Sequence, residues 1–155
     1  MRAVVIRVSR ASVTINGQSG GSIGKGFLIL LGVKNGDTLS ESSYLAEKCA
    51  GLRVFEDENG KMNLGLKDIG GELMVISNFT LYADCSHGKR PSFINAAKPD
   101  ISVPLYEAFI SELKKKDINV VTGEFGADMQ IDHVNDGPVT IILDTDEMRG
   151  KKNAD

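Results

Sequence analysis

The chain has 155 residues, of which 41% are hydrophobic and 25% charged, and its 18 basic and 21 acidic residues give a net charge of −3. These values are those of an ordinary folded domain that is large enough to bury a core, and they exclude a disordered or fibrous chain. A weakly acidic chain cannot bind nucleic acid through its whole surface, so any such partner must be met by a local basic patch.

The sequence carries no sign of export, membrane insertion or metal binding. Its N-terminus lacks a sustained apolar region and a small-residue cleavage site, and no apolar run approaches the roughly 18 residues of a membrane span. Cys49 and Cys85 lie far apart, without the spacing of a zinc or redox motif. We therefore expect a cytoplasmic protein with no membrane partner, no metal and no cofactor.

The first part of the chain predicts strands and one helix. Residues 3–15 are rich in Val and Ile and predict one or two strands, followed by a turn at Asn16-Gly17. The apolar run 27–31 predicts a strand that is covered on both faces. Thr38 and Glu41 have the spacing of a capping box, and the apolar pattern after them predicts a helix over 39–50.

The middle of the chain predicts a hairpin, a buried strand and a second helix. Residues 52–55 and 62–64 flank a turn-forming segment and predict the hairpin. The strand is expected at 73–76, and residues 84–91 are expected to form a polar loop. Apolar side chains at helical spacing predict a helix over about 101–116, with Pro104 in its first turn.

Strands complete the predicted domain near residues 119–122, 128–134 and 139–143. From residue 145 to residue 155 the chain is polar and without periodicity, so we expect a frayed, disordered tail. Many strands and only two helices favour a single α+β domain over residues 1–144, with mixed β-sheets and two main helices packed on one side.

Three other polar features have ordinary structural explanations. Gly24-Lys25 lacks the remaining residues of a phosphate-binding loop. His87 and His133 belong to no cluster of metal-ligand spacing, and a surface loop and a strand position explain them. The run 114–116 consists of lysines at a helix C-terminus, where cations interact favourably with the helix dipole. A contact with nucleic-acid phosphates is the alternative for this run.

Two segments are candidates for the chemistry. Ser77-Asn78-Phe79-Thr80-Leu81 follows a buried strand, and strand ends are places where polar groups emerge from a core. Asn135-Asp136-Gly137-Pro138-Val139-Thr140 lies near the C-terminus. Taken singly, the first is explained as a structural strand end and the second as a turn.

In this order, the two segments resemble the two signature motifs of the D-aminoacyl-tRNA deacylases. The family usually has glutamine at the position of Asn78, whose side chain is one methylene shorter. The resemblance runs from about residue 1 to residue 144 and includes these further segments: Arg7-Val8, Ala11-Ser12-Val13, Gly60–Leu64, Arg90-Pro91-Ser92-Phe93 and Ala127-Asp128-Met129.

The resemblance implies a hydrolase that cuts D-amino acids, and mischarged glycine, from the terminal adenosine of tRNA. It implies a homodimer in which a cis Gly137–Pro138 peptide enters the site of the partner subunit. There the two carbonyl oxygens would recognise the α-amino group and leave no room for an L side chain. The implied catalytic residues are Ser77, Phe79 and Thr80, and the implied substrate-binding residues are Arg7, Asn78, Phe93, Met129, Gly137 and Pro138.

The catalytic group has two candidates. Backbone amides around Phe79 and Thr80 can form an oxyanion hole, worth roughly 3–4 kcal/mol per donor, with help from the ribose 2′-hydroxyl of the substrate. The Thr80 hydroxyl is the alternative nucleophile, although it would need a general base beside it.

Two other functions stay open at the level of sequence. One is an editing hydrolase for a different mischarged aminoacyl-tRNA. The other is a non-catalytic tRNA- or nucleotide-binding module, which would be expected to carry a basic, aromatic face.

Overall fold

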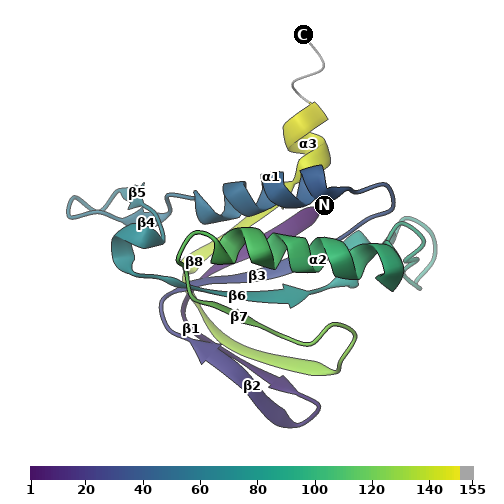
Figure 1. Ribbon diagram of the computed structural model, residues 1–155, viewed down its shortest axis with the longest axis horizontal. Coiled ribbons are helices and arrows are strands. Elements are labelled where there is room, and N and C mark those ends of the chain that lie inside the picture. Colours follow the sequence, from purple (N-terminus) through teal and green to yellow (C-terminus); the bar gives the residue numbers. More distant parts are fainter. Residues whose placement is uncertain (151–155) are drawn as a thin grey trace.

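The computed structural model describes residues 1–150, and a long strand, β1 (Arg2–Ile15), organises its sheet (Figure 1). β1 pairs antiparallel with three strands. Its first half pairs with β3 (Gly26–Gly32), its second half with β2 (Gln18–Ile23), and nearly its whole length with β8 (Met129–Asp144).

Parallel pairing extends the sheet beyond β3. The strand β6 (Glu72–Ser77) pairs with β3, and β7 (Val120–Thr122) pairs with β6. A separate short hairpin is formed by β4 (Phe55–Glu56) and β5 (Met62–Leu64). The sheet is therefore mixed, as the sequence predicts.

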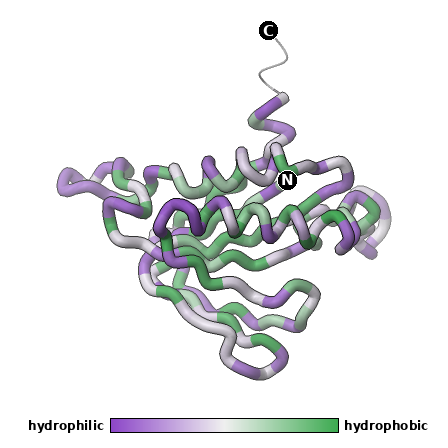
Figure 2. The backbone as a smooth tube through the Cα atoms, viewed as in Figure 1, coloured by the Kyte–Doolittle hydropathy of each residue, from purple (hydrophilic) through white to green (hydrophobic). Residues whose placement is uncertain are grey.

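Two helices, α1 (Leu39–Ala50) and α2 (Pro99–Lys114), lie side by side on one face of the sheet (Figure 1). Figure 2 shows the hydrophobic segments gathered in the strands beneath them. Side chains alternate along each strand, so Phe27, Ile29 and Val75 face the helices, whereas Leu28 and Met74 face a second core on the opposite side. The expected α+β fold with helices on one side is confirmed.

Helix α1 begins where its capping box predicts. The Thr38 hydroxyl accepts a hydrogen bond from the Ser40 amide at 3.3 Å, and the Glu41 carboxylate accepts one from the Thr38 amide at 2.8 Å. These bonds satisfy amides that the first helical turn leaves without partners. The helix runs over residues 39–50 as expected.

Helix α2 begins two residues earlier than predicted. Pro99 occupies its first turn, where a missing amide hydrogen costs nothing, and the Lys98 carbonyl accepts from the amides of Ile101 and Ser102. Pro104 therefore lies inside the helix and not in its first turn.

The C-terminal strands also differ from the prediction. The expected strands 128–134 and 139–143 form one strand, β8, and the segment between them is a bulge in that strand. Strand β2 was not predicted, because its sequence, Gln-Ser-Gly-Gly-Ser-Ile, has a single β-branched residue and no aromatic residue to favour a strand. Pairing with β1 holds it in place.

The expectation of a frayed tail from residue 145 is wrong for its first six residues, which form helix α3 (Thr145–Gly150). Tertiary contacts hold this helix. The buried Met1 ammonium donates to the Thr145 hydroxyl at 2.7 Å, and Arg149 donates to Glu41 at 2.6 Å. The rest of the predicted tail, residues 151–155, lies outside the described residues.

Two further short 3-10 helices are η1 (Lys67–Ile69) and η2 (Phe79–Tyr82). Across residues 1–150, the helices are too short or too polar for any of them to span a membrane.

Candidate active site

The first candidate segment forms the junction between β6 and η2. Ser77 is the last residue of β6, and the Asn78 amide donates to the Leu31 carbonyl of β3 at 2.8 Å. Gly32 lets η2 approach β3, since a Cβ there would lie 3.1 Å from Leu81 Cβ and 3.2 Å from the Asn78 carbonyl oxygen. The neighbouring parallel strand β3 thus fixes the junction, and glycine at position 32 leaves the space that η2 needs to pack against β3.

Two hollows meet at this junction. One, of about 200 Å³ and mainly apolar, lies between the end of β6, helix α2 and the segment before β8. The other, of about 430 Å³, extends along the opposite face of the sheet toward His133. Both are lined by Ser77, Asn78, Ala127 and Met129. The two hollows can therefore hold two dissimilar parts of one substrate, one part on each side of the Ser77–Asn78 backbone.

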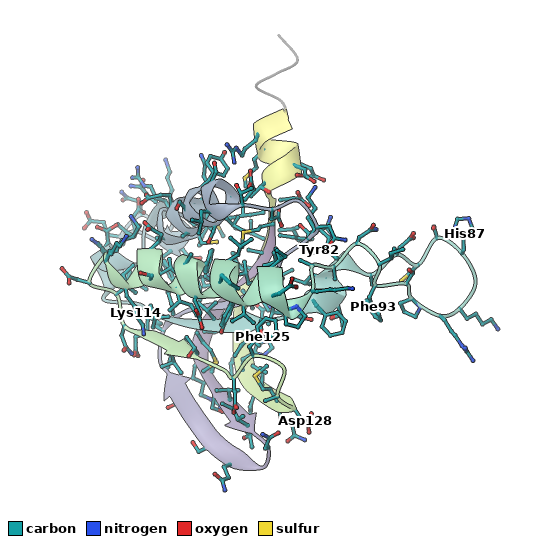
Figure 3. All side chains as sticks on the ribbon, turned by 45° about the vertical axis from the view of Figure 1, so that its right-hand side comes forward. Tyr82, His87, Phe93, Lys114, Phe125 and Asp128 are labelled. Carbon is teal, nitrogen blue, oxygen red and sulfur yellow. The ribbon has the colours of Figure 1, made fainter. Side chains whose placement is uncertain are left out.

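Two aromatic side chains lie at the edge of the first hollow. Phe79 lines it yet is 55% exposed, and its ring packs edge-on against Phe93 with centroids 5.1 Å apart. Figure 3 shows Phe93 near one end of α2 and Phe125 just below the helix. An exposed aromatic pair beside a hollow is suited to stacking on a planar ring of a ligand.

Within residues 1–150, the hydroxyl of Thr80 has no base as a hydrogen-bond partner. It is exposed and donates a hydrogen bond to the side-chain oxygen of Asn78, and an amide oxygen is a poor proton acceptor. His87 bonds to Ser86 at 2.8 Å and lies at the far end of a loop (Figure 3). The second histidine, His133, lies on β8 and lines the second hollow, which does not include Thr80.

The backbone at the start of η2 offers donors instead. The first amides of any helix have no acceptor within that helix, and in η2 these are the amides of Phe79 and Thr80. They follow directly after the residues shared by the two hollows. Adjacent amides of this kind can stabilise an oxyanion that forms beside them.

The second candidate segment is the bulge in β8. Asn135 pairs with Val8 and Thr140 pairs with Ile6, so four residues of β8 lie opposite the single residue Arg7. The Asn135 side chain closes the bulge, donating to the Thr140 hydroxyl at 3.0 Å and accepting from the Val139 amide at 3.2 Å. These bonds explain the asparagine and threonine at the two ends of the motif.

Gly137 and Pro138 stand at the centre of this bulge, and both are exposed. The peptide bond between them is cis, as the resemblance implies. Gly137 has φ +125°, and a Cβ there would lie 2.8 Å from Val139 Cγ2 and 3.0 Å from Arg7 Nη2. Both the backbone angle and the space therefore require glycine.

Arg7 supports the bulge from below. The side chain is 4% exposed, and its guanidinium donates to the carbonyl oxygens of Asp136 at 3.1 Å and Val54 at 2.6 Å. It also forms an ion pair with Glu56 at 3.0 Å, and this hydrogen bond holds the pKa of the Glu56 carboxyl below its usual value. The rigid fork of arginine fixes the bulge against the β4–β5 hairpin.

Comparison with known proteins places these motifs in a family. The family model for D-Tyr-tRNA(Tyr) deacylase matches residues 4–144. The chain belongs to this family. Curated relatives named D-aminoacyl-tRNA deacylase include one from Roseiflexus castenholzii, 57% identical with 99% of this chain and 98% of the relative covered. Another, from Thermus aquaticus, is 52% identical with 98% and 100% covered.

Solved structures share the fold. A c-Myc DNA unwinding element binding protein superposes with a TM-score of 0.86 at 40% identity, covering 93% of this chain and 98% of the other. A probable eukaryotic D-amino acid tRNA deacylase has the same fold, with a TM-score of 0.78 at 12% identity and 92% and 97% covered. The chain is thus an enzyme of the deacylase family, a family of hydrolases.

The deacylase residues expected from the sequence fall into two groups. Around the hollows lie the residues of the β6–η2 junction together with two more distant side chains: Ser77, Asn78, Phe79, Thr80, Phe93 and Met129. Arg7, Gly137 and Pro138 form a separate group at the bulge and line neither hollow. Arg7 is buried beneath the bulge, where it contacts backbone carbonyls and the carboxylates of Glu56 and Asp136.

Sequence reasoning missed two aromatic residues that line the first hollow. Tyr106 lies within the segment predicted as the second helix, and it lines the first hollow while its hydroxyl donates to the Val75 carbonyl at 2.9 Å. Phe125 packs on Tyr106 with ring centroids 6.0 Å apart and also lines the hollow. The only available signal was the proximity of Phe125 to the family-like segment Ala127-Asp128-Met129.

Proposed function

We propose that this protein hydrolyses the ester bond between a D-amino acid and the 3′-terminal adenosine of tRNA, and that it also deacylates mischarged glycyl-tRNA. The observation that carries the proposal is that each of the two family motifs forms a distinct structure. One motif lies where two hollows meet, and the other forms a rigid, exposed bulge. The names of the curated relatives support the same substrate.

The separation of the two groups favours a homodimer. The bulge lines neither hollow of its own chain, whereas a partner subunit related by twofold symmetry can insert its bulge there. A partly exposed apolar row supports such a contact. Leu30, Val4 and Ile142 lie opposite one another across β3, β1 and β8, and Ile142 is 67% exposed. Leu30 also lines the second hollow, so a partner on this row would border the site.

The proposed reaction relies on backbone groups. Water attacks the ester carbonyl, and the developing oxyanion accepts hydrogen bonds from the amides of Phe79 and Thr80. The ribose 2′-hydroxyl of the substrate assists, and the amino acid and the tRNA leave as separate products. Thr80 as the nucleophile is disfavoured because its hydroxyl is bonded to Asn78 and not to a base.

We propose that chirality is read by exclusion. The carbonyl oxygens of Gly137 and Pro138 from the partner subunit accept from the α-amino group, and an L side chain would collide with them. A discrimination of about 10⁴ corresponds to about 5.5 kcal/mol, whereas an apolar pocket gains only about 1–3 kcal/mol per methylene. Enantiomers carry the same groups, so steric exclusion by rigid carbonyl oxygens discriminates between them better than an apolar pocket does.

The direct test compares D-tyrosyl-tRNA with L-tyrosyl-tRNA. We expect release of free tyrosine from the D-ester at a kcat/KM about 10⁴ times that for the L-ester. Equal rates for the two esters would favour an editing hydrolase of different specificity. No hydrolysis of either ester would contradict the proposed function.

Glycyl-tRNA separates exclusion from recognition of the D side chain, because glycine has no side chain to exclude or to bind. Under exclusion, glycyl-tRNA is cleaved at a rate nearer to that of D-alanyl-tRNA than to that of L-alanyl-tRNA. If glycyl-tRNA resists hydrolysis as strongly as the L-ester, the site must read the D side chain and the role proposed for Gly137 and Pro138 is wrong.

A non-catalytic nucleic-acid-binding module is the second candidate. It is favoured by the name of the solved relative that is 40% identical, a DNA unwinding element binding protein. Its signature in the same assay would be retention of tRNA by the protein with no release of amino acid.

A further inference from the structure

The segment between η2 and α2 combines basic and aromatic side chains next to the site. We define the basic loop as residues 84–94, which include Lys89, Arg90, Phe93 and Ile94. Both cations are exposed, and neither has an ion-pair partner within residues 1–150. Ile94 is 77% exposed. Exposed cations interleaved with apolar groups are typical of nucleic-acid contacts.

Hydrogen bonds hold the base of this loop in place. Asp84 and Ser92 exchange two backbone hydrogen bonds, of 2.7 and 2.9 Å, and the Asp84 carboxylate accepts from the Ser86 amide at 2.9 Å. Asn35 donates to the carbonyl oxygen of Ile94, at the C-terminal end of the loop, and to that of Asn95, the residue after it. The two cations are therefore carried on an anchored hairpin-like loop, which Figure 3 shows projecting away from the sheet with His87 at its far end.

The basic loop is joined directly to the candidate active site. Phe93, at its base, packs on Phe79, which lines the first hollow. Lys89 lies five positions after Asp84, so the loop can extend at most about 18 Å from its base. Stacked nucleotides rise about 3.4 Å each along one strand. A loop of this length therefore spans about five nucleotides.

The basic loop differs in charge from the second hollow and from the C-terminal end of α2. The second hollow is bordered by Asp128, which directly precedes β8, so an anionic strand would be repelled there. At the end of α2, Lys115 and Lys116 are already paired with Glu112 and Glu47. The basic loop thus carries two exposed cations and is connected to the first hollow through the packing of Phe93 on Phe79.

We propose that the basic loop binds the phosphates of the tRNA 3′ strand upstream of the terminal adenosine, through Lys89 and Arg90. This inference rests on the proposed function and adds the surface that recognises the tRNA body. In this arrangement the adenosine occupies the first hollow beside Phe79, and the preceding nucleotides pass over Phe93 toward the tip of the loop.

The experiment compares a double variant, Lys89→Ala with Arg90→Ala, with a control, Lys61→Ala with Lys67→Ala. The control removes the same charge from exposed positions near β5 and η1, at the opposite end of the molecule (Figure 1). Two substrates are used, D-tyrosyl-tRNA and the minimal ester D-tyrosyl-adenosine. Affinity for uncharged tRNA is measured in parallel by fluorescence anisotropy over a range of salt concentrations.

For the loop variant we expect kcat/KM on D-tyrosyl-tRNA to fall about tenfold at low salt, mainly through KM, with the minimal ester changed less than about twofold. The slope of log affinity for uncharged tRNA against log salt should decrease in magnitude by about 1.4, because two phosphate contacts are lost. The control should behave as the wild type in every assay.

An equal loss on both substrates would overturn the proposal, because it would mean that the loop only supports the site through Phe93. An unchanged salt slope, or a control as impaired as the loop variant, would also overturn it. If the wild-type protein fails to cleave D-tyrosyl-tRNA, the proposed function fails, and the salt dependence of tRNA binding still decides on the loop by itself.

Discussion

At the scale of single residues, the backbone groups of the candidate site and its side chains have different roles. Thr80 places an amide at the start of η2, while its hydroxyl is bonded to Asn78. Gly137 provides a conformation and a space that a residue with a side chain cannot. The substitutions that matter are therefore those that disturb the backbone.

We expect Thr80→Ala to keep activity on D-tyrosyl-tRNA within about tenfold of the wild type, and Gly137→Val to abolish it. Alanine retains the Thr80 amide, whereas valine at 137 would be forced against Val139 and Arg7 at a φ that disfavours a side chain. The measurement is kcat/KM, with thermal unfolding to check that each variant is folded. A loss of about a thousandfold in folded Thr80→Ala would establish its hydroxyl as the nucleophile.

A matched pair of tyrosines tests the energetics of buried hydroxyls. The Tyr82 hydroxyl is buried without a hydrogen-bond partner in residues 1–150, whereas the Tyr106 hydroxyl donates to Val75. Burial raises the pKa of Tyr82 above its usual value and that of Tyr106 to about 12, so both remain neutral. We expect Tyr82→Phe to raise the free energy of unfolding by about 1 kcal/mol and Tyr106→Phe to lower it by about 1 kcal/mol. Urea denaturation that shows equal losses for both would refute this.

At the scale of elements, local signals succeed where the stabilising groups are close in sequence. The capping box of α1 is complete within four residues, and its helix has the predicted bounds. Strand β2 and helix α3 were not predicted because their partners are distant. β2 depends on β1, and α3 depends on Met1 and Glu41.

The capping box provides a prediction on stability without an effect on catalysis. Thr38→Ala removes the acceptor for the Ser40 amide and should lower the free energy of unfolding by about 1 kcal/mol, while Thr38→Ser should retain most of it. Chemical denaturation measures both variants, and their kcat/KM should equal that of the wild type because α1 lines neither hollow. A Thr38→Ser variant as unstable as Thr38→Ala would show that the methyl group matters and not the cap.

At the scale of the whole molecule, the two motifs belong to separate parts of one chain, and the apolar row on the face opposite the helices offers the contact that would unite them. Ile142 is the most exposed member of that row, at 67%. Its position beside the bulge of β8 links assembly to activity, because a subunit that loses this contact would also lose the partner's Gly137 and Pro138.

We expect Ile142→Glu to convert a dimer into a folded monomer with little activity, because a charge buried in an apolar contact costs several kcal/mol. The control is Leu39→Glu on α1, where leucine is 62% exposed and a carboxylate suits the first turn of the helix. Sedimentation measures the assembly, and kcat/KM measures the activity. A wild-type monomer that is fully active at low concentration would exclude the dimeric site.

The sequence by itself determined the elements whose signals are local and the order of the two motifs along the chain. Periodicity located α1 and α2, because burial on one face imposes a period on the side chains, and continuous apolar runs located the strands that are covered on both faces. Resemblance identified the motifs as those of the deacylases. Residues 135–140 read as a turn, since Asn, Asp, Gly and Pro have the same local preferences in a turn and in a bulge.

Only the tertiary structure decided where these residues meet. It placed Arg7 beneath the bulge, set Tyr106 and Phe125 beside Ser77, and joined two predicted strands into β8. These outcomes depend on contacts between residues far apart in the chain, such as Arg7 with Asp136 and Asn78 with Leu31. Such contacts form only when the sheet brings distant strands side by side, and no local pattern of the sequence records them.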